Sequence, residues 1–119
     1  MSKLKETQPI LVSNESIEHG VKLTLKVQSS LDYFEGHFPE LPILAGVVQL
    51  DWAVKFANEY LGLSSAVVKQ VEVLKFQEMI RADQVVDLSL TRKSDYKFLF
   101  KYVSDIGVHA SGRIVLEEA

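Results

Sequence analysis

The sequence predicts an α+β fold, a curved antiparallel sheet wrapped around one long central helix. Three observations lead to this prediction. Residues 46–61 carry apolar side chains at helical spacing, segments that resemble strands lie before and after them, and the later segments are joined by very short connections. With 119 residues, the chain is expected to form one domain, residues 1–119.

Two strand segments and a loop are expected before the helix. Residues 21–27 alternate strictly between apolar and polar side chains, which is typical of a half-buried strand. Residues 10–12 predict a shorter strand piece, and the polar residues 13–16 predict a turn that separates the two. Residues 35–45 contain two prolines and a glycine and predict a loop.

The central segment predicts a helix that ends at Gly62. Its apolar residues at spacings of three and four are Val47, Leu50, Val54, Ala57 and Leu61. Trp52, Phe56 and Tyr60 are apolar as well, so we expect most of the helix circumference to be buried.

The second half of the chain predicts the strands that surround this helix. Residues 66–76 form a β-branched run, and residues 86–91, 96–103 and 108–116 alternate between apolar and polar positions. The connections at residues 93–95 and 104–107 are short enough for hairpins, so these strands should be antiparallel neighbours.

The composition excludes several classes of function. Hydrophobic residues make up 47% of the chain, and the net charge of −3 argues against a nucleic-acid partner or membrane insertion. The absence of cysteine excludes disulfides, thiolate metal sites and cysteine nucleophiles. No apolar stretch is long enough to span a bilayer, and the N-terminus is unlike a signal peptide. We therefore expect a cytoplasmic protein without a metal or cofactor.

The chain has three histidines, and one of them is a candidate for catalysis. His19 precedes a glycine in a turn region, and His109 lies on the polar face of the last strand; both are expected to be surface residues. His37 lies in a Gly-His-Phe-Pro loop shortly before the helix. From its position alone it is either an ordinary loop histidine or a catalytic group.

Two residues of the helix also have alternative interpretations. Asp51 stands four residues before Lys55 and shares a narrow stripe of the helix with Lys55 and Asn58, so it could be a solvated surface residue or act as an acid in a site. Gly46 opens the helix, where unpaired backbone N–H groups can bind a developing oxyanion. The same glycine could instead serve only the backbone shape of the loop.

Residues 34–51 resemble the signature of the β-hydroxyacyl-acyl-carrier-protein dehydratases, which are hotdog-fold enzymes of fatty-acid biosynthesis. The resemblance consists of a Gly-His-Phe loop, a glycine nine residues after His37 and an acidic residue fourteen after it. Residues 74–83 are similar to a second motif of that family, and the resemblance covers roughly residues 10–117.

This resemblance implies a set of site residues. His37 would be the catalytic base and Asp51 the catalytic acid, and the Gly46 N–H would polarise the thioester carbonyl. Phe38 and Val47 would contact the substrate. In that family the two catalytic side chains of one site come from different subunits, so a homodimer, or a higher oligomer, is expected.

The reaction that the resemblance implies is the dehydration of a 3-hydroxyacyl thioester, carried on acyl carrier protein or a coenzyme A-type thiol, to the trans-2-enoyl thioester. A neutral imidazole can take the α-proton, and a carboxyl group can protonate the leaving hydroxyl. Two alternatives remain. One is an acyl-thioesterase on the same fold, and the other is a non-catalytic acyl-binding partner subunit.

The sequence departs from the family pattern at several positions. Ala45 replaces a proline, Glu40 replaces a glycine, and Trp52 follows the acid, where it could reshape the acyl site. These departures indicate a divergent branch, similar to the small dehydratases of specialised lipid or aryl polyene pathways. A basic docking surface for an acidic carrier could include Arg81, Arg92, Lys93, Lys97 and Lys101, although these residues could equally be scattered surface charges.

Overall fold

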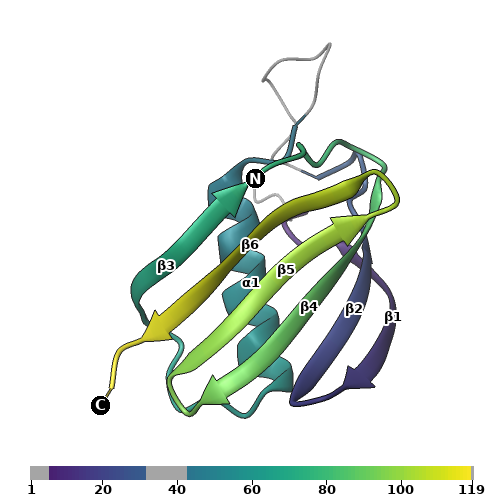
Figure 1. The fold of residues 1–119 in the computed structure, drawn as a ribbon. Coiled ribbons are helices and arrows are strands. Elements are labelled where there is room, and N and C mark those ends of the chain that lie inside the picture. Colours follow the sequence, from purple (N-terminus) through teal and green to yellow (C-terminus); the bar gives the residue numbers. More distant parts are fainter. Residues whose placement is uncertain (1–5, 32–42, 119) are drawn as a thin grey trace, which may run out of the picture.

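The computed structural model describes residues 6–31 and 43–118. These residues form a six-stranded sheet and one helix, which lies across one face of the sheet (Figure 1). The elements are β1 (Ile10–Ile17), β2 (Gly20–Lys26), α1 (Gly46–Tyr60), β3 (Val68–Phe76), β4 (Val85–Ser94), β5 (Lys97–Ser104) and β6 (Gly107–Leu116). In the described part of the chain, no helix is long and apolar enough to cross a membrane.

The sheet is antiparallel throughout, with the strand order β1-β2-β4-β5-β6-β3. The hairpins predicted between β4 and β5 and between β5 and β6 are therefore present. Strand β3, which follows the helix, pairs with β6 at one edge of the sheet, and among the described residues no strand lies on its other side. Strand β1 forms the opposite edge.

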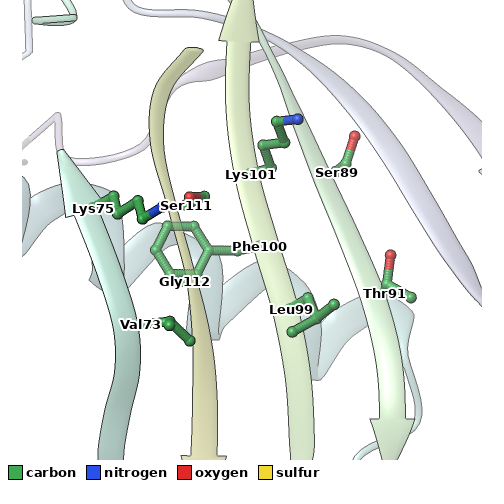
Figure 2. Close-up of a pocket in the computed structure, with 9 residues that line it drawn as sticks. All are labelled: Val73, Lys75, Ser89, Thr91, Leu99, Phe100, Lys101, Ser111 and Gly112. Atoms are coloured by element: carbon green, nitrogen blue, oxygen red, sulfur yellow. The ribbon is translucent and has the colours of Figure 1, made fainter. Parts of the chain in front are cut away.

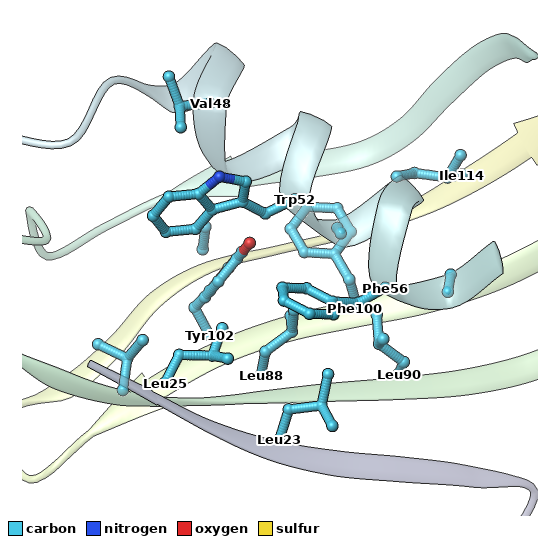
Figure 3. Packing of buried hydrophobic residues seen from close by; sticks show 14 of the residues in the cluster. Leu23, Leu25, Val48, Trp52, Phe56, Leu88, Leu90, Phe100, Tyr102 and Ile114 are labelled. Atoms are coloured by element: carbon cyan, nitrogen blue, oxygen red, sulfur yellow. The ribbon is translucent and has the colours of Figure 1, made fainter. Parts of the chain in front are cut away.

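The core lies between α1 and the inner face of the sheet (Figure 3). The alternation in β2 places Val21, Leu23 and Leu25 there, as the sequence predicted. The helix contributes Trp52 and Phe56, which pack over buried aromatic and aliphatic residues of the central strands, among them Leu88, Leu90, Phe100 and Tyr102.

The turn expected at residues 13–16 is wrong. Strand β1 continues through these residues, and Glu15 pairs with Lys22 of β2 and approaches its ammonium group to 3.3 Å. The polar composition of these residues is typical of a turn. Their backbone groups are instead satisfied by pairing with β2. The reversal instead occurs just after Ile17, where His19 has a φ of 60°.

The helix is less enclosed than the sequence suggested. Its buried residues, Val48 and Trp52 among them, face the sheet, whereas the side chain of Val47 is 72% exposed. Leu50 and Val54 are only partly buried. The prediction that most of the helix circumference is buried is therefore wrong for the described chain. The sheet covers one side of the helix and leaves an apolar stripe exposed.

Candidate active site around Asp51 and Gly46

Three of the five expected site residues lie on the first half of α1, and two cannot be placed. Gly46 is the first residue of the helix, Val47 follows it, and Asp51 comes five residues after Gly46, about 7.5 Å further along the axis. His37 and Phe38 lie outside the described residues.

Asp51 borders an apolar hollow between α1 and β3. The hollow has a volume of about 310 Å³, and it is lined by Val47, Leu50, Asp51, Val54, Ala66, Val68, Val71 and Ile114. Asp51 provides the charge in this otherwise aliphatic lining. An apolar surface beside one carboxyl group suits a substrate with a hydrocarbon chain and a polar reacting group.

Asp51 is exposed, as its interpretation as a solvated surface residue expects. In the described part of the chain, however, no ion pair joins it to Lys55. Trp52, which could have reshaped the site, is fully buried in the core instead, donates a hydrogen bond of 2.9 Å to the Thr7 carbonyl, and does not line the hollow. The Asp51 carboxylate is thus accessible from the open side of the helix.

A second hollow lies at the N-terminus of α1. It has a volume of about 310 Å³, and Gly46, Phe76 and His109 are among its lining residues. Within residues 6–31 and 43–118 no side chain caps the helix, and the N–H groups of Val48 and Gln49 bond to the Ala45 carbonyl. This leaves the N–H groups of Gly46 and Val47 without an acceptor among the described residues. Two adjacent N–H donors at the positive end of a helix suit a developing negative charge.

Gln49, which the sequence did not single out, lies beside the expected site. Its side chain lines the second hollow, and its Nε2 donates a hydrogen bond of 3.1 Å to the Leu44 carbonyl. Its backbone carbonyl accepts a hydrogen bond of 2.7 Å from the hydroxyl of Tyr102. Burial raises the pKa of that hydroxyl well above its usual range, and the charge of Asp51 raises it further, so Tyr102 remains a donor. The sequence offered one signal for this residue, which is a polar side chain placed between the apolar residues Val48 and Leu50.

The expectation that His109 is a surface residue is wrong, since its side chain is 1% exposed. Its Nδ1–H donates to the Glu78 carbonyl at 3.0 Å, because a carbonyl can only accept. Its Nε2 then accepts from the Ser104 hydroxyl at 2.6 Å. The segment after β3 folds over this histidine and buries it. His19, by contrast, is exposed in its turn, as expected.

A third hollow, of about 390 Å³, lies on the opposite face of the sheet from the helix (Figure 2). Lys75 and Lys101 are at its rim, with hydroxyl side chains from β4 and β6. Lys101 is one of the basic residues expected to dock a carrier, whereas Arg92 is occupied by an ion pair with Asp95. Neither Asp51 nor Gly46 lines this hollow.

Comparison with known families identifies the chain. The model of the ApeI-like family, described as ApeI dehydratase, matches residues 13–113. The chain belongs to the ApeI-like dehydratase family. This membership confirms the resemblance to thioester dehydratases of a divergent branch. No curated protein matches the sequence significantly.

Solved structures confirm the hotdog fold of this ApeI-like chain. It is similar to a chain of the dehydratase heterocomplex ApeI:P from Xenorhabdus doucetiae, with 28% identity and a TM-score of 0.83 over 93% of this chain and 99% of that one. It is also similar to an uncharacterized protein from Erwinia carotovora subsp. atroseptica, with 28% identity and a TM-score of 0.73 over 91% and 94% of the two chains.

Proposed function

We propose that this chain, as one dehydratase domain, removes water from a 3-hydroxyacyl thioester and forms the trans-2-enoyl thioester. The observation that carries the proposal is the position of Asp51. Its carboxylate borders an apolar hollow, on the same helix whose uncapped N-terminus begins at Gly46. A group that can donate a proton and a group that can stabilise an oxyanion thus stand on one rigid element.

In the proposed reaction, His37 takes the proton from the α-carbon of the substrate. The electron pair of that C–H bond forms the double bond between the α- and β-carbons, and the bond from the β-carbon to the hydroxyl oxygen breaks. Asp51 supplies the proton with which the hydroxyl leaves as water. Transfer of a proton from His37 back to Asp51, directly or through solvent, restores both groups for the next turnover.

The N-terminus of α1 supports the same reaction. Loss of the α-proton places negative charge on the thioester oxygen, and the Gly46 N–H is available to donate to it. Val47 is exposed beside Asp51 and lines the apolar hollow, so it can contact the acyl chain. Phe38, which follows the proposed base in the sequence, has the same role in this proposal.

We further propose that a second copy of the chain completes the site. The hollow beside Asp51 is open, and β3 presents a free edge within the described chain together with the exposed apolar side chains Val68, Val73, Leu74 and Phe76. Long, apolar edge strands are rare in isolated proteins because they pair with other chains. The Xenorhabdus relative is a heterocomplex, which makes a different subunit at this edge the second candidate.

The substrate that we propose is an acyl group on acyl carrier protein or a coenzyme A-type thiol. A thioester fits the polar end of the site, because its carbonyl oxygen becomes the charged atom that Gly46 would meet. The exposed basic residues Lys93 and Lys101 remain candidates for contact with an acidic carrier.

The experiment is an assay of the purified protein with 3-hydroxyacyl thioesters of several chain lengths, on carrier protein and on pantetheine. Product mass and released thiol are followed together. Loss of one water from an intact thioester supports the proposal. Release of free thiol would instead indicate a thioesterase, and the absence of both signals across all substrates would indicate an acyl-binding partner subunit.

A further inference from the structure

Gln49 is a polar side chain among the buried residues of α1. Its side chain is only 4% exposed, one turn into α1. Because the Leu44 carbonyl can only accept, the amide must turn Nε2 toward it, which leaves Oε1 on the other side. Oε1 is buried and has no hydrogen-bond partner in the described chain.

This arrangement is unfavourable for folding. A buried carbonyl oxygen without a donor has lost its hydrogen bonds to water and gained none in return. A methionine at residue 49 would fill a similar volume without that loss, but it would take the amide donor away from the Leu44 carbonyl. A buried amide with one bonded atom and one atom without a partner in the described chain is a candidate for a functional role.

The contact to Leu44 acts on the start of the helix. The Leu44 N–H donates to the Ile80 carbonyl at 2.8 Å, and Gln49 binds the Leu44 carbonyl, so this residue is held from both sides. Gln49 is itself anchored to the sheet by the hydroxyl of Tyr102. The next carbonyl, that of Ala45, accepts from the N–H groups of Val48 and Gln49.

These contacts fix the direction of one N–H group. No peptide bond in the described chain is cis, so the Gly46 N–H points opposite to the Ala45 carbonyl, out of the end of the helix. Two backbone hydrogen bonds hold this peptide plane at the Ala45 carbonyl, and the hydrogen bond from Gln49 holds the preceding plane at the Leu44 carbonyl. The side chain of Gln49 thus restrains the peptide group next to the one that carries the proposed oxyanion donor.

We propose that Gln49 is a positioning residue, which holds the Leu44 carbonyl and so aims the Gly46 N–H at the thioester oxygen. This inference rests on the proposed dehydration and deepens it. Gln49 does not touch the reacting atoms and acts only through the peptide groups of residues 44–46.

The test compares Gln49→Met with a matched control, Gln28→Met. Gln28 is also a buried glutamine that donates to a backbone carbonyl, that of Gln8 at 2.9 Å, and its Oε1 also lacks a partner in the described chain. Its Nε2 donates in addition to the Glu6 carboxylate at 2.7 Å, so the control removes at least as many hydrogen bonds. We expect Gln49→Met to remain folded at the assay temperature while its turnover falls at least about tenfold with little change in KM. Gln28→Met should keep wild-type turnover. Wild-type turnover in Gln49→Met, or a loss that only follows the folded fraction, would overturn the proposal.

A spectroscopic measurement separates this inference from the proposed function. In ¹⁵N-labelled protein, we expect the Gly46 amide of Gln49→Met to shift and to exchange its hydrogen with solvent at a changed rate, and the Gly46 amide of Gln28→Met to stay as in wild type. An unreactive butyryl-pantetheine, bound to wild type, should show a lowered carbonyl stretching frequency that Gln49→Met does not produce. If wild type dehydrates no thioester, the proposed function fails, but the shift and exchange rate of the Gly46 amide still test the role of Gln49. An unchanged Gly46 amide in Gln49→Met would overturn the proposed role of Gln49.

Discussion

The ring of Phe76 on β3 lies against Gly46, the first residue of α1. A Cβ built on Gly46 would come within 2.7 Å of Phe76 Cζ, which is closer than carbon atoms approach without movement. The absence of a side chain at residue 46 thus allows an aromatic ring from the edge strand to line the hollow at the helix N-terminus. The glycine is needed for this close approach.

Gly46→Ala should therefore impair activity more than stability. The added methyl group must displace the Phe76 ring, which is partly exposed and can swing aside, so we expect the free energy of unfolding to change by about 1 kcal/mol or less. Turnover should fall at least about tenfold, because the ring and the Gly46 N–H no longer keep their relative positions. In a Phe76→Ala background, Gly46→Ala should reduce turnover by a smaller factor. Equal losses in the two backgrounds, measured as a double-mutant cycle, would contradict this explanation.

Asp51→Asn should abolish most activity and leave the fold intact. Asp51 is exposed and makes no ion pair in the described chain, so we expect the free energy of unfolding to change by about 0.5 kcal/mol or less. Turnover should fall at least about 100-fold, since an amide cannot protonate the leaving hydroxyl. Glu59→Gln, at an exposed acid on the same helix, is the control and should retain activity. An active Asp51→Asn enzyme would exclude the proposed role.

Val47→Asp should weaken association of the chains. Val47 is the most exposed apolar residue of the helix face beside β3, and burying a valine contributes about 1.5–3 kcal/mol. A charge in its place should raise the dissociation constant of the dimer at least about tenfold, as measured by sedimentation. Val12→Asp is the control, because Val12 is also an exposed valine but lies on β1, at the other edge of the sheet. The same oligomeric state in wild type and both variants would argue against an interface at the β3 edge.

Alkaline pH should destabilise the fold through Tyr102. Burial, together with the charge of Asp51, raises the pKa of its hydroxyl, so the folded chain keeps this proton to a higher pH than the unfolded chain. The stabilisation is complete below about pH 10, where unfolded tyrosine titrates, and it falls by about 1.4 kcal/mol per pH unit above that value. Tyr102→Phe lacks this dependence. Denaturant titrations between pH 9 and 11 should therefore show a steeper loss for wild type, and parallel curves would contradict the prediction.

The strands and the helix were predictable because burial imposes a period on the sequence. The alternation in β2, the spacing from Val47 to Leu61 and the short connections around β5 each reflect one buried face. The exposure of Val47 was not predictable from that period. Periodicity shows that a side chain is apolar, but it does not show whether the chain itself or a second chain covers it.

The polar residues were harder to predict than the apolar ones. His109 has polar neighbours at residues 111 and 113, yet the segment after β3 folds over it and its ring bonds to Ser104 and Glu78. Gln49 is buried because its amide reaches back five residues to Leu44. Such contacts depend on where loops meet elements far away in the sequence. Asp51 and Gly46 were predicted from their motif, and the structure adds the hollows beside them.

The most direct test of the proposed site mixes two inactive variants. His37→Ala, which we expect to lose at least about 100-fold in turnover, is combined with Asp51→Asn under conditions that exchange subunits. If each site takes His37 from one chain and Asp51 from another, random mixing gives dimers of which half are mixed, each with one intact site. Loss of water from a 3-hydroxyacyl thioester should then recover to about a quarter of the wild-type rate. No recovery, with subunit exchange verified by mass, would contradict a dehydratase site shared between two chains.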